Sequence, residues 1–114
     1  MKPRGNFVVP EIIVLEFTAP EAAEIYRSVN RLLGLEEGSS DLGSWPAPLL
    51  SHVAGASGDK LIVVEAWESR AAQEEFMTQL GAAFEKASVP PPTRVEWFTP
   101  VGEMHRHGPM ASVT

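Results

Sequence analysis

Hydrophobic and polar positions in the first third of the chain change from a strand-like to a helical pattern. Residues 7–17 are rich in Val, Ile, Leu and Phe, a composition typical of a β-strand, and Pro10 restricts the first half of this strand to an edge or a bulge. The segment 18–21 predicts the start of a helix with a capping box, in which Thr18 accepts from a first-turn N–H and Glu21 reaches back. Pro20 suits the first turn because its missing N–H would have no partner there. One apolar stripe at helical spacing follows, and Gly34 is expected to end the helix. Its members are Ala22, Ile25, Tyr26, Val29, Leu32 and Leu33.

The rest of the chain repeats this alternation after a polar loop at 36–48. Residues 49–56 and 61–67 are two strand-like runs separated by Ser57-Gly58-Asp59-Lys60, which predicts a β-hairpin. Ser69 is expected to cap a second helix, whose apolar face carries Ala72, Phe76, Leu80, Ala83 and Phe84. The three prolines at 90–92 end it, and residues 94–98 form the last predicted strand.

The predicted order is therefore strand, helix, strand, strand, helix, strand. This order is typical of the α+β, ferredoxin-like β-α-β-β-α-β fold, which has an antiparallel sheet with both helices on one face. The 114 residues suit one domain. We expect that domain to span residues 1–105 and residues 106–114 to form a flexible C-terminal tail, because the end of the chain is small and polar.

The third strand is apolar on both of its faces. Leu61, Val63 and Trp67 alternate with Ile62, Val64 and Ala66 along residues 61–67. A strand that is apolar on both faces is normally buried on both. The helices of the ferredoxin-like fold cover only one face of the sheet. Pairing of two sheets in a homodimer would bury the other face, so we expect the chain to associate with itself.

Composition and charge narrow the function classes. The chain has 9 Lys and Arg and 15 Asp and Glu, so its formal net charge is 9 − 15 = −6. This acidic balance argues against a nucleic-acid partner. The absence of cysteine excludes disulfides and thiolate chemistry. No apolar run is long enough for a membrane span, and the N-terminus lacks the apolar core of a secretory signal. We therefore expect a cytoplasmic protein without a membrane partner.

One pair of side chains stands out as chemically reactive. If Gly58-Asp59 is a two-residue turn, position 52 opposes 65 and position 50 opposes 67. Cross-strand partners share a face, which would hold Leu50, His52, Ala54, Val63, Glu65 and Trp67. We expect it to be the face that the helices leave open. A carboxylate next to an imidazole orients a general base, so His52 and Glu65 are catalytic candidates. A buried polar pair or a salt bridge at the rim of a dimer interface is the alternative, and a one-residue register change would separate them.

The three tryptophans and the C-terminal histidines are the remaining candidates. Trp45, Trp67 and Trp97 could wall a cavity for a flat organic ligand, although packing in the core or at an interface explains a single tryptophan as well. The sequence His105-Arg106-His107 has a metal-binding spacing but lacks an evident third ligand, so we expect a solvated tail and no metal site. Phosphate loops, dinucleotide fingerprints and nucleophile elbows are absent from the sequence.

The segment 61–69, which ends in Trp67-Glu68-Ser69 and runs into a helix with Phe76, resembles the dimeric α+β barrel superfamily. Within it the chain is similar to the antibiotic biosynthesis monooxygenase group and to small actinobacterial proteins, over roughly residues 11–105. The resemblance implies that two sheets from two chains form one barrel, with a cavity between each sheet and its own helices. It places Trp67 in that cavity. Val63 and Gln73 stand where the quinone-forming members have an asparagine and a tyrosine.

Together these observations predict a homodimer that binds an aromatic or polyketide-like molecule in a hydrophobic cavity. The resemblance favours a monooxygenase that needs no cofactor, with His52 as base, Glu65 as its orienting partner and Trp67 as a wall. Trp45, Leu50, Val63, Gln73 and Trp97 are the expected substrate contacts. A cyclase or isomerase that uses the same base without oxygen, and a protein that only binds a small metabolite, are the alternatives.

Overall fold

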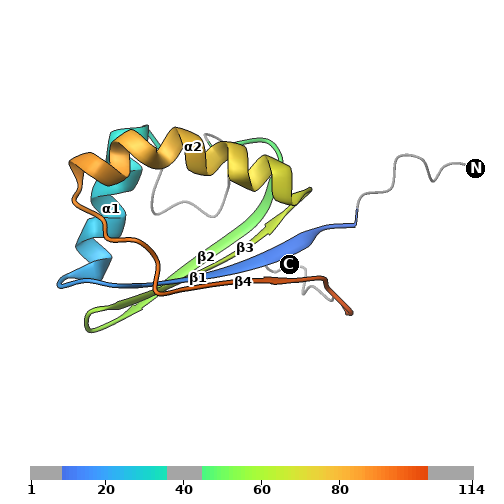
Figure 1. Ribbon diagram of the computed structural model, residues 1–114, viewed down its shortest axis with the longest axis horizontal. Coiled ribbons are helices and arrows are strands. Elements are labelled where there is room, and N and C mark those ends of the chain that lie inside the picture. The colour runs from blue at the N-terminus through green and yellow to red at the C-terminus, as the bar shows by residue number, and fades with distance from the viewer. Residues whose placement is uncertain (1–8, 36–44, 103–114) are drawn as a thin grey trace, which may run out of the picture.

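The six predicted elements are all present in the chain, in the predicted order. The computed structural model describes residues 9–35 and 45–102. The elements are β1 (Glu11–Thr18), α1 (Ala22–Leu33), β2 (Leu49–Ser57), β3 (Lys60–Trp67), α2 (Arg70–Lys86) and β4 (Arg94–Phe98). The strands form one antiparallel sheet in the order β2-β3-β1-β4. Both helices lie on the same face of this sheet (Figure 1), which confirms the α+β ferredoxin-like fold.

The first strand and the first helix begin later than predicted. Pro10 precedes β1 instead of lying within it, because a residue without an N–H cannot donate to the ladder. Thr18 is the last residue of β1 and pairs with Lys60, so it does not cap the helix. Glu21 takes the N-cap position with a left-handed backbone, φ 55°, and makes no side-chain capping bond. The predicted capping box is therefore wrong, because Thr18 is already part of the sheet.

The other helix boundaries follow the predicted signals. Gly34 ends α1 in the left-handed conformation, φ 72°, and its N–H donates to the carbonyl of Arg31. Glycine adopts this conformation without the Cβ clash that other residues suffer. The Ser69 hydroxyl accepts from the N–H of Ala72 and caps α2. These two residues mark the C-terminal end of α1 and the N-terminal end of α2.

The core lies between the helices and the sheet face toward which they pack, which we call the covered face. Alternate residues of β1 and β3 supply its floor, and Trp67, with no exposed surface, is its most enclosed large side chain. The helices close it from above with Val29 of α1 and Phe76 and Leu80 of α2. The buried apolar residues of the strands are Ile13, Leu15, Phe17, Leu49, Leu61, Val63 and Trp67.

Neither α1 nor α2 lies over the opposite face of the sheet, which we call the uncovered face (Figure 1). Val53 and Val64, which pair across β2 and β3, are 66% and 38% exposed. Phe98 at the end of β4 is 38% exposed and pairs with the half-buried Ile12. The second apolar stripe of the third strand is thus real, and within one chain it stays partly open to water.

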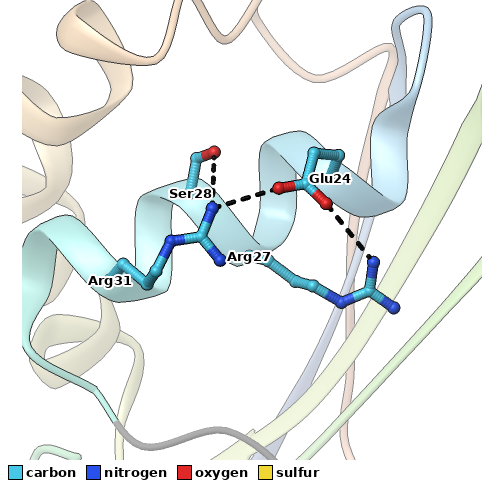
Figure 2. A network of polar contacts seen from close by, with 4 residues as sticks. All are labelled: Glu24, Arg27, Ser28 and Arg31. Atoms are coloured by element: carbon cyan, nitrogen blue, oxygen red, sulfur yellow. Dashed lines mark hydrogen bonds and ion pairs between the residues drawn. The ribbon is translucent and has the colours of Figure 1, made fainter.

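The orientation of α1 about its own axis is set by one charged and one largely apolar side. On the outer side Glu24 pairs with Arg27 at 3.6 Å and with Arg31 at 3.1 Å (Figure 2). Leu32, predicted to belong to the apolar stripe, is 49% exposed, whereas the polar Asn30 is only 4% exposed. The prediction for Leu32 was wrong because hydropathy gives a helix face only to within one residue.

Several predicted features lie outside the described residues. They are the loop at 36–44, the tail at 106–114 and the pair His105 and His107. Neither α1 nor α2 is long and apolar enough to cross a membrane.

Candidate functional site

The β2–β3 hairpin determines which side chains meet. Gly58 and Asp59 form a two-residue turn, with Ser57 opposite Lys60. Gly58 has a φ of 63°, a conformation that the tight hairpin turns require. The register places His52 opposite Glu65, which confirms that these two residues share a face.

A β-bulge interrupts the same register near the other end of the hairpin. The pairing shifts between Leu49 and Ser51, so that Trp67 opposes Leu49. Leu49 is 4% exposed and Leu50 is 46% exposed. The prediction that Leu50 opposes position 67 and lies on the site's face was therefore wrong, because a bulge adds one residue to one strand and shifts the side chains beyond it to the other face.

The shared face of His52 and Glu65 is the covered face, not the open one that we expected. Glu65 pairs with Ile13, a core residue of β1 that is 2% exposed. The side chains of His52 and Glu65 retain only 10% and 7% of their exposure. The candidate pair therefore lies under the helices.

Four side chains from three elements form one hydrogen-bonded chain. The carboxylate of Glu65 accepts from Trp67 Nε1 at Oε1, over 2.8 Å, and Oε2 lies 2.7 Å from Nδ1 of His52. The other ring nitrogen of His52, Nε2, lies 2.5 Å from the hydroxyl of Tyr26 on α1. We call this series, Trp67–Glu65–His52–Tyr26, the relay.

The hydrogen-bonding capacities of the groups place the protons in the relay. An ionised carboxylate only accepts, so Nδ1 of His52 carries a proton and donates it to Glu65. In a neutral ring Nε2 is then the acceptor, and the Tyr26 hydroxyl donates to it. Two donated hydrogen bonds offset the cost of burying the Glu65 carboxylate. The arrangement leaves His52 poised to take the phenolic proton of Tyr26.

Aromatic contacts hold the imidazole of His52 in place. Trp45 packs on it with ring centroids 4.5 Å apart and an interplanar angle of 41°. The rings of Tyr26 and His52 lie nearly parallel, with 14° between their planes. Fixed rings matter because proton transfer depends on the orientation of donor and acceptor.

A cavity between the sheet and the helices is open to the relay. Its empty space measures about 720 Å³, a figure that includes the part that opens to solvent. Among the described wall residues only Glu65 is acidic and none is Lys or Arg. The wall is formed by Leu15, Phe17, Ala19, Ala22, Ile25, Tyr26, Val29, Asn30, Leu33, Leu35, Trp45, His52, Leu61, Val63, Glu65, Phe76, Met77, Leu80, Phe84, Val89 and Pro90. Such a wall suits a neutral, largely apolar molecule.

The predicted site residues divide between the wall and its surroundings. Trp45, His52, Val63 and Glu65 belong to the wall. The other candidates do not form part of it.

Trp67 is fully enclosed behind the wall and reaches the site only through its hydrogen bond to Glu65. Gln73 is buried, at 4% exposure, and is not part of the wall. Trp97 packs beside the core, with the guanidinium of Arg70 5.0 Å from its ring centre. None of the three forms part of the wall that a ligand in this cavity would contact.

Two polar wall residues were missed by the sequence analysis, and both belong to α1. Tyr26 was assigned to the apolar stripe of the helix and Asn30 was not considered. They are four residues apart and so share a helix face. The sequence does contain a signal: Asn30 is polar but lies on the helix face that carries Tyr26, Val29 and Leu33. In the described part of the chain, no cluster of three or more His, Asp or Glu residues could hold a metal ion.

Comparisons with known proteins support the fold. No protein-family model matches the sequence, and no curated protein matches it. Among solved structures, the chain is similar to a candidate antibiotic biosynthesis monooxygenase from Chloroflexus aurantiacus, with 14% identity and a TM-score of 0.58, covering 84% of this chain and 97% of that one.

Two further solved structures share the architecture. A monooxygenase from the gene ActVA-Orf6 of Streptomyces coelicolor, in complex with the ligand nanaomycin D, has 21% identity, a TM-score of 0.56 and coverage of 87% and 94%. A dimeric ferredoxin-like protein from an uncultured marine organism has 17% identity, a TM-score of 0.52 and coverage of 86% and 91%. The chain thus has the α+β fold of the antibiotic biosynthesis monooxygenase-like proteins, as the resemblance implied.

Proposed function

We propose that this protein is a cofactor-independent monooxygenase that acts on an aromatic or polyketide-type molecule in the cavity between its sheet and its helices. The relay carries the proposal, because it connects a buried carboxylate to a hydroxyl in a largely apolar wall. The similarity to a monooxygenase with nanaomycin D bound supports it at the level of the fold.

Tyr26 is the residue that contacts the substrate in this proposal. Its oxygen accepts an acidic C–H or O–H proton of the substrate while its own proton passes to Nε2 of His52. Glu65 then faces an imidazolium, which its carboxylate stabilises over 2.7 Å. Glu65 and His52 act through Tyr26, and Trp67 holds Glu65 in position.

The oxygen step balances with molecular oxygen as the only oxidant. A deprotonated CH₂ group that is conjugated with an aromatic ketone, as in anthrone, donates electrons to O₂ and forms a C–O bond, which gives a peroxide anion. The imidazolium of His52 returns its proton through Tyr26 to that anion. The O–O bond then breaks with loss of the remaining C–H proton, so that CH₂ plus O₂ become C=O plus H₂O.

The test is oxygen uptake with anthrone as substrate. We expect Tyr26→Phe, which keeps the ring and removes only the hydroxyl, to lower kcat at least tenfold, and His52→Ala to lower it further. Ser51→Ala, one residue from His52 on the exposed side of β2, is the matched control. If Tyr26→Phe is as active as the wild type while His52→Ala is inactive, His52 contacts the substrate directly. Uptake that is unchanged in both variants would refute the proposal.

A cyclase or isomerase is the second candidate, and the wall itself favours it. The resemblance implies hydrogen-bonding groups at positions 63 and 73, but Val63 is apolar and Gln73 lies outside the wall. Proton transfer alone needs only the relay. An isomeric product formed without oxygen uptake would identify this activity, and saturable quenching of Trp45 without turnover would identify a protein that only binds the molecule.

We further propose that two copies of the chain pair through their uncovered faces to form the dimeric α+β barrel. The partly exposed Val53, Val64 and Phe98 support this pairing, because apolar patches of this kind mark interfaces. A solved structure of this fold is described as dimeric. Light scattering at micromolar concentration should give twice the chain mass, and Val64→Lys should give the mass of one chain without loss of helix content. A monomeric wild type would refute the pairing.

A further inference from the structure

Asn30 is the most unusual residue of the cavity wall. It is 4% exposed and lies on the inner side of α1, one helical turn after Tyr26. Its backbone carbonyl accepts from the N–H of Leu35. Its side-chain amide makes no hydrogen bond among the residues that the structure describes. An amide buried to this extent normally has partners.

The amide of Asn30 opens into the cavity. Within the described residues, no side-chain nitrogen or oxygen is fully enclosed without a hydrogen-bond partner. Because the amide is unpaired, it must therefore retain a small accessible surface. Asn30 lines the cavity and is otherwise buried, so this surface faces the cavity.

We propose that Asn30 recognises a carbonyl oxygen of the ligand and thereby selects neutral aromatic ketones over hydrocarbons of the same shape. The proposal rests on the proposed function and names the substrate class of the same cavity. We infer a neutral ligand because the described wall contains no Lys or Arg to pair with a negative charge. We infer a carbonyl group because the wall offers a donor, an amide N–H without a hydrogen-bond partner among the described residues.

The position of Asn30 relative to Tyr26 gives the amide a role during reaction as well. Side chains four residues apart on a helix are neighbours, with their Cβ atoms about 5–6 Å apart. A ligand whose acidic C–H lies at Tyr26 can place the oxygen of the conjugated ketone at Asn30. When the proton leaves, negative charge moves to that oxygen, and an N–H already directed at it stabilises the enolate.

The first test compares two probes that differ only in the carbonyl group, 1-tetralone and tetralin, by equilibrium dialysis with the full chain. We expect the wild type to bind the ketone more tightly. Asn30→Leu, which keeps the size and removes the amide, should weaken ketone binding about tenfold and leave tetralin binding within twofold. Asn30→Asp should also lose ketone binding because it has no N–H to donate. Ser28→Ala, on the outer side of α1, is the control.

Thermal stability separates recognition from a structural role. An unpaired buried amide costs stability, so Asn30→Leu should raise the melting temperature by a few degrees. If Asn30 instead stabilised the fold, Asn30→Leu would lower the melting temperature. The inference predicts a variant that is more stable and less able to bind the ketone.

The outcomes distinguish this inference from the function on which it rests. Wild-type protein that binds neither probe would overturn both. Wild-type protein that binds both probes, with Asn30→Leu unchanged or weakened equally for the two, would overturn the role of Asn30 and leave the cavity as a binding site. A lower melting temperature in Asn30→Leu would also count against it.

Discussion

The two faces of the sheet differ in a way that is unusual for a small protein. The covered face of β3 carries Glu65 among core residues, and this carboxylate is 6% exposed. The uncovered face carries Ile62, Val64 and Ala66, which are only partly buried. On β3, the covered face thus holds a charge, whereas the uncovered face, which is open to water, is apolar.

Both proposals, chemistry on the covered face and association on the uncovered face, draw on this inversion. Burying a carboxylate costs free energy unless hydrogen bonds compensate, and Glu65 receives two of them in a wall that has no other acidic residue among those described. A group held at this cost beside a cavity points to chemistry on the covered face. Exposed valines instead point to association on the uncovered face.

The largest expected difference between the faces concerns aromatic residues. Trp67→Ala should lower the free energy of unfolding by about 3–5 kcal/mol, because it empties a fully enclosed site and removes a donor from Glu65. Phe98→Ala, on the uncovered face, should cost about 1 kcal/mol or less in the separate chain. Urea denaturation at low protein concentration measures both. Equal losses would mean that the two faces are packed alike.

An intermediate effect is expected from two neighbouring valines that differ only in the face they occupy. Val63 is 6% exposed and Val64 is 38% exposed. Val63→Ala should cost about 1.5–2.5 kcal/mol, from the lost burial of two carbon atoms and a small cavity. Val64→Ala should cost about 0.5 kcal/mol in the separate chain.

Measurements at several protein concentrations extend the comparison between Val63→Ala and Val64→Ala. If the uncovered face is buried between two chains, the melting temperature rises with concentration, and the cost of Val64→Ala rises with it while that of Val63→Ala stays constant. A Val64→Ala cost that does not depend on concentration would contradict pairing through this face.

The smallest effect is expected on the outer side of α1. Arg27 is about half exposed and pairs with Glu24 at 3.6 Å (Figure 2). Exposed ion pairs of this kind contribute little, so Arg27→Ala should change the free energy of unfolding by less than about 0.5 kcal/mol. It should leave ligand binding unchanged as well. A loss comparable to that of Val63→Ala would show that the charged side of the helix supports the cavity.

Local sequence signals account for most of the fold. Alternation and helical spacing identify all six elements, Ser69 and Gly34 mark two helix ends, and Gly58-Asp59 sets the hairpin turn. These signals are reliable because each depends on a few neighbouring residues. The capping role predicted for Thr18 failed because β1 extends to this residue, a fact that depends on pairing with β3.

The candidate site was predictable only in part. The pairing of His52 with Glu65 follows from the turn by counting residues, but the bulge that moves Leu50 outward gives no such signal. Tyr26 and Asn30 reach the site from a helix, and nothing in their spacing says which strand residues they meet.

The sequence by itself therefore determined the order of elements, the turn register and the presence of two apolar faces on β3. Those properties depend on the periodicity of apolar residues and on turn residues that lie close together along the chain. Only the tertiary structure decided that His52 and Glu65 lie under the helices, that Trp67 stands behind the wall, and that α1 turns Asn30 inward and Leu32 outward. The reason is physical: these choices are made by packing between elements far apart in sequence, where the burial of a whole face outweighs the preference of any single residue.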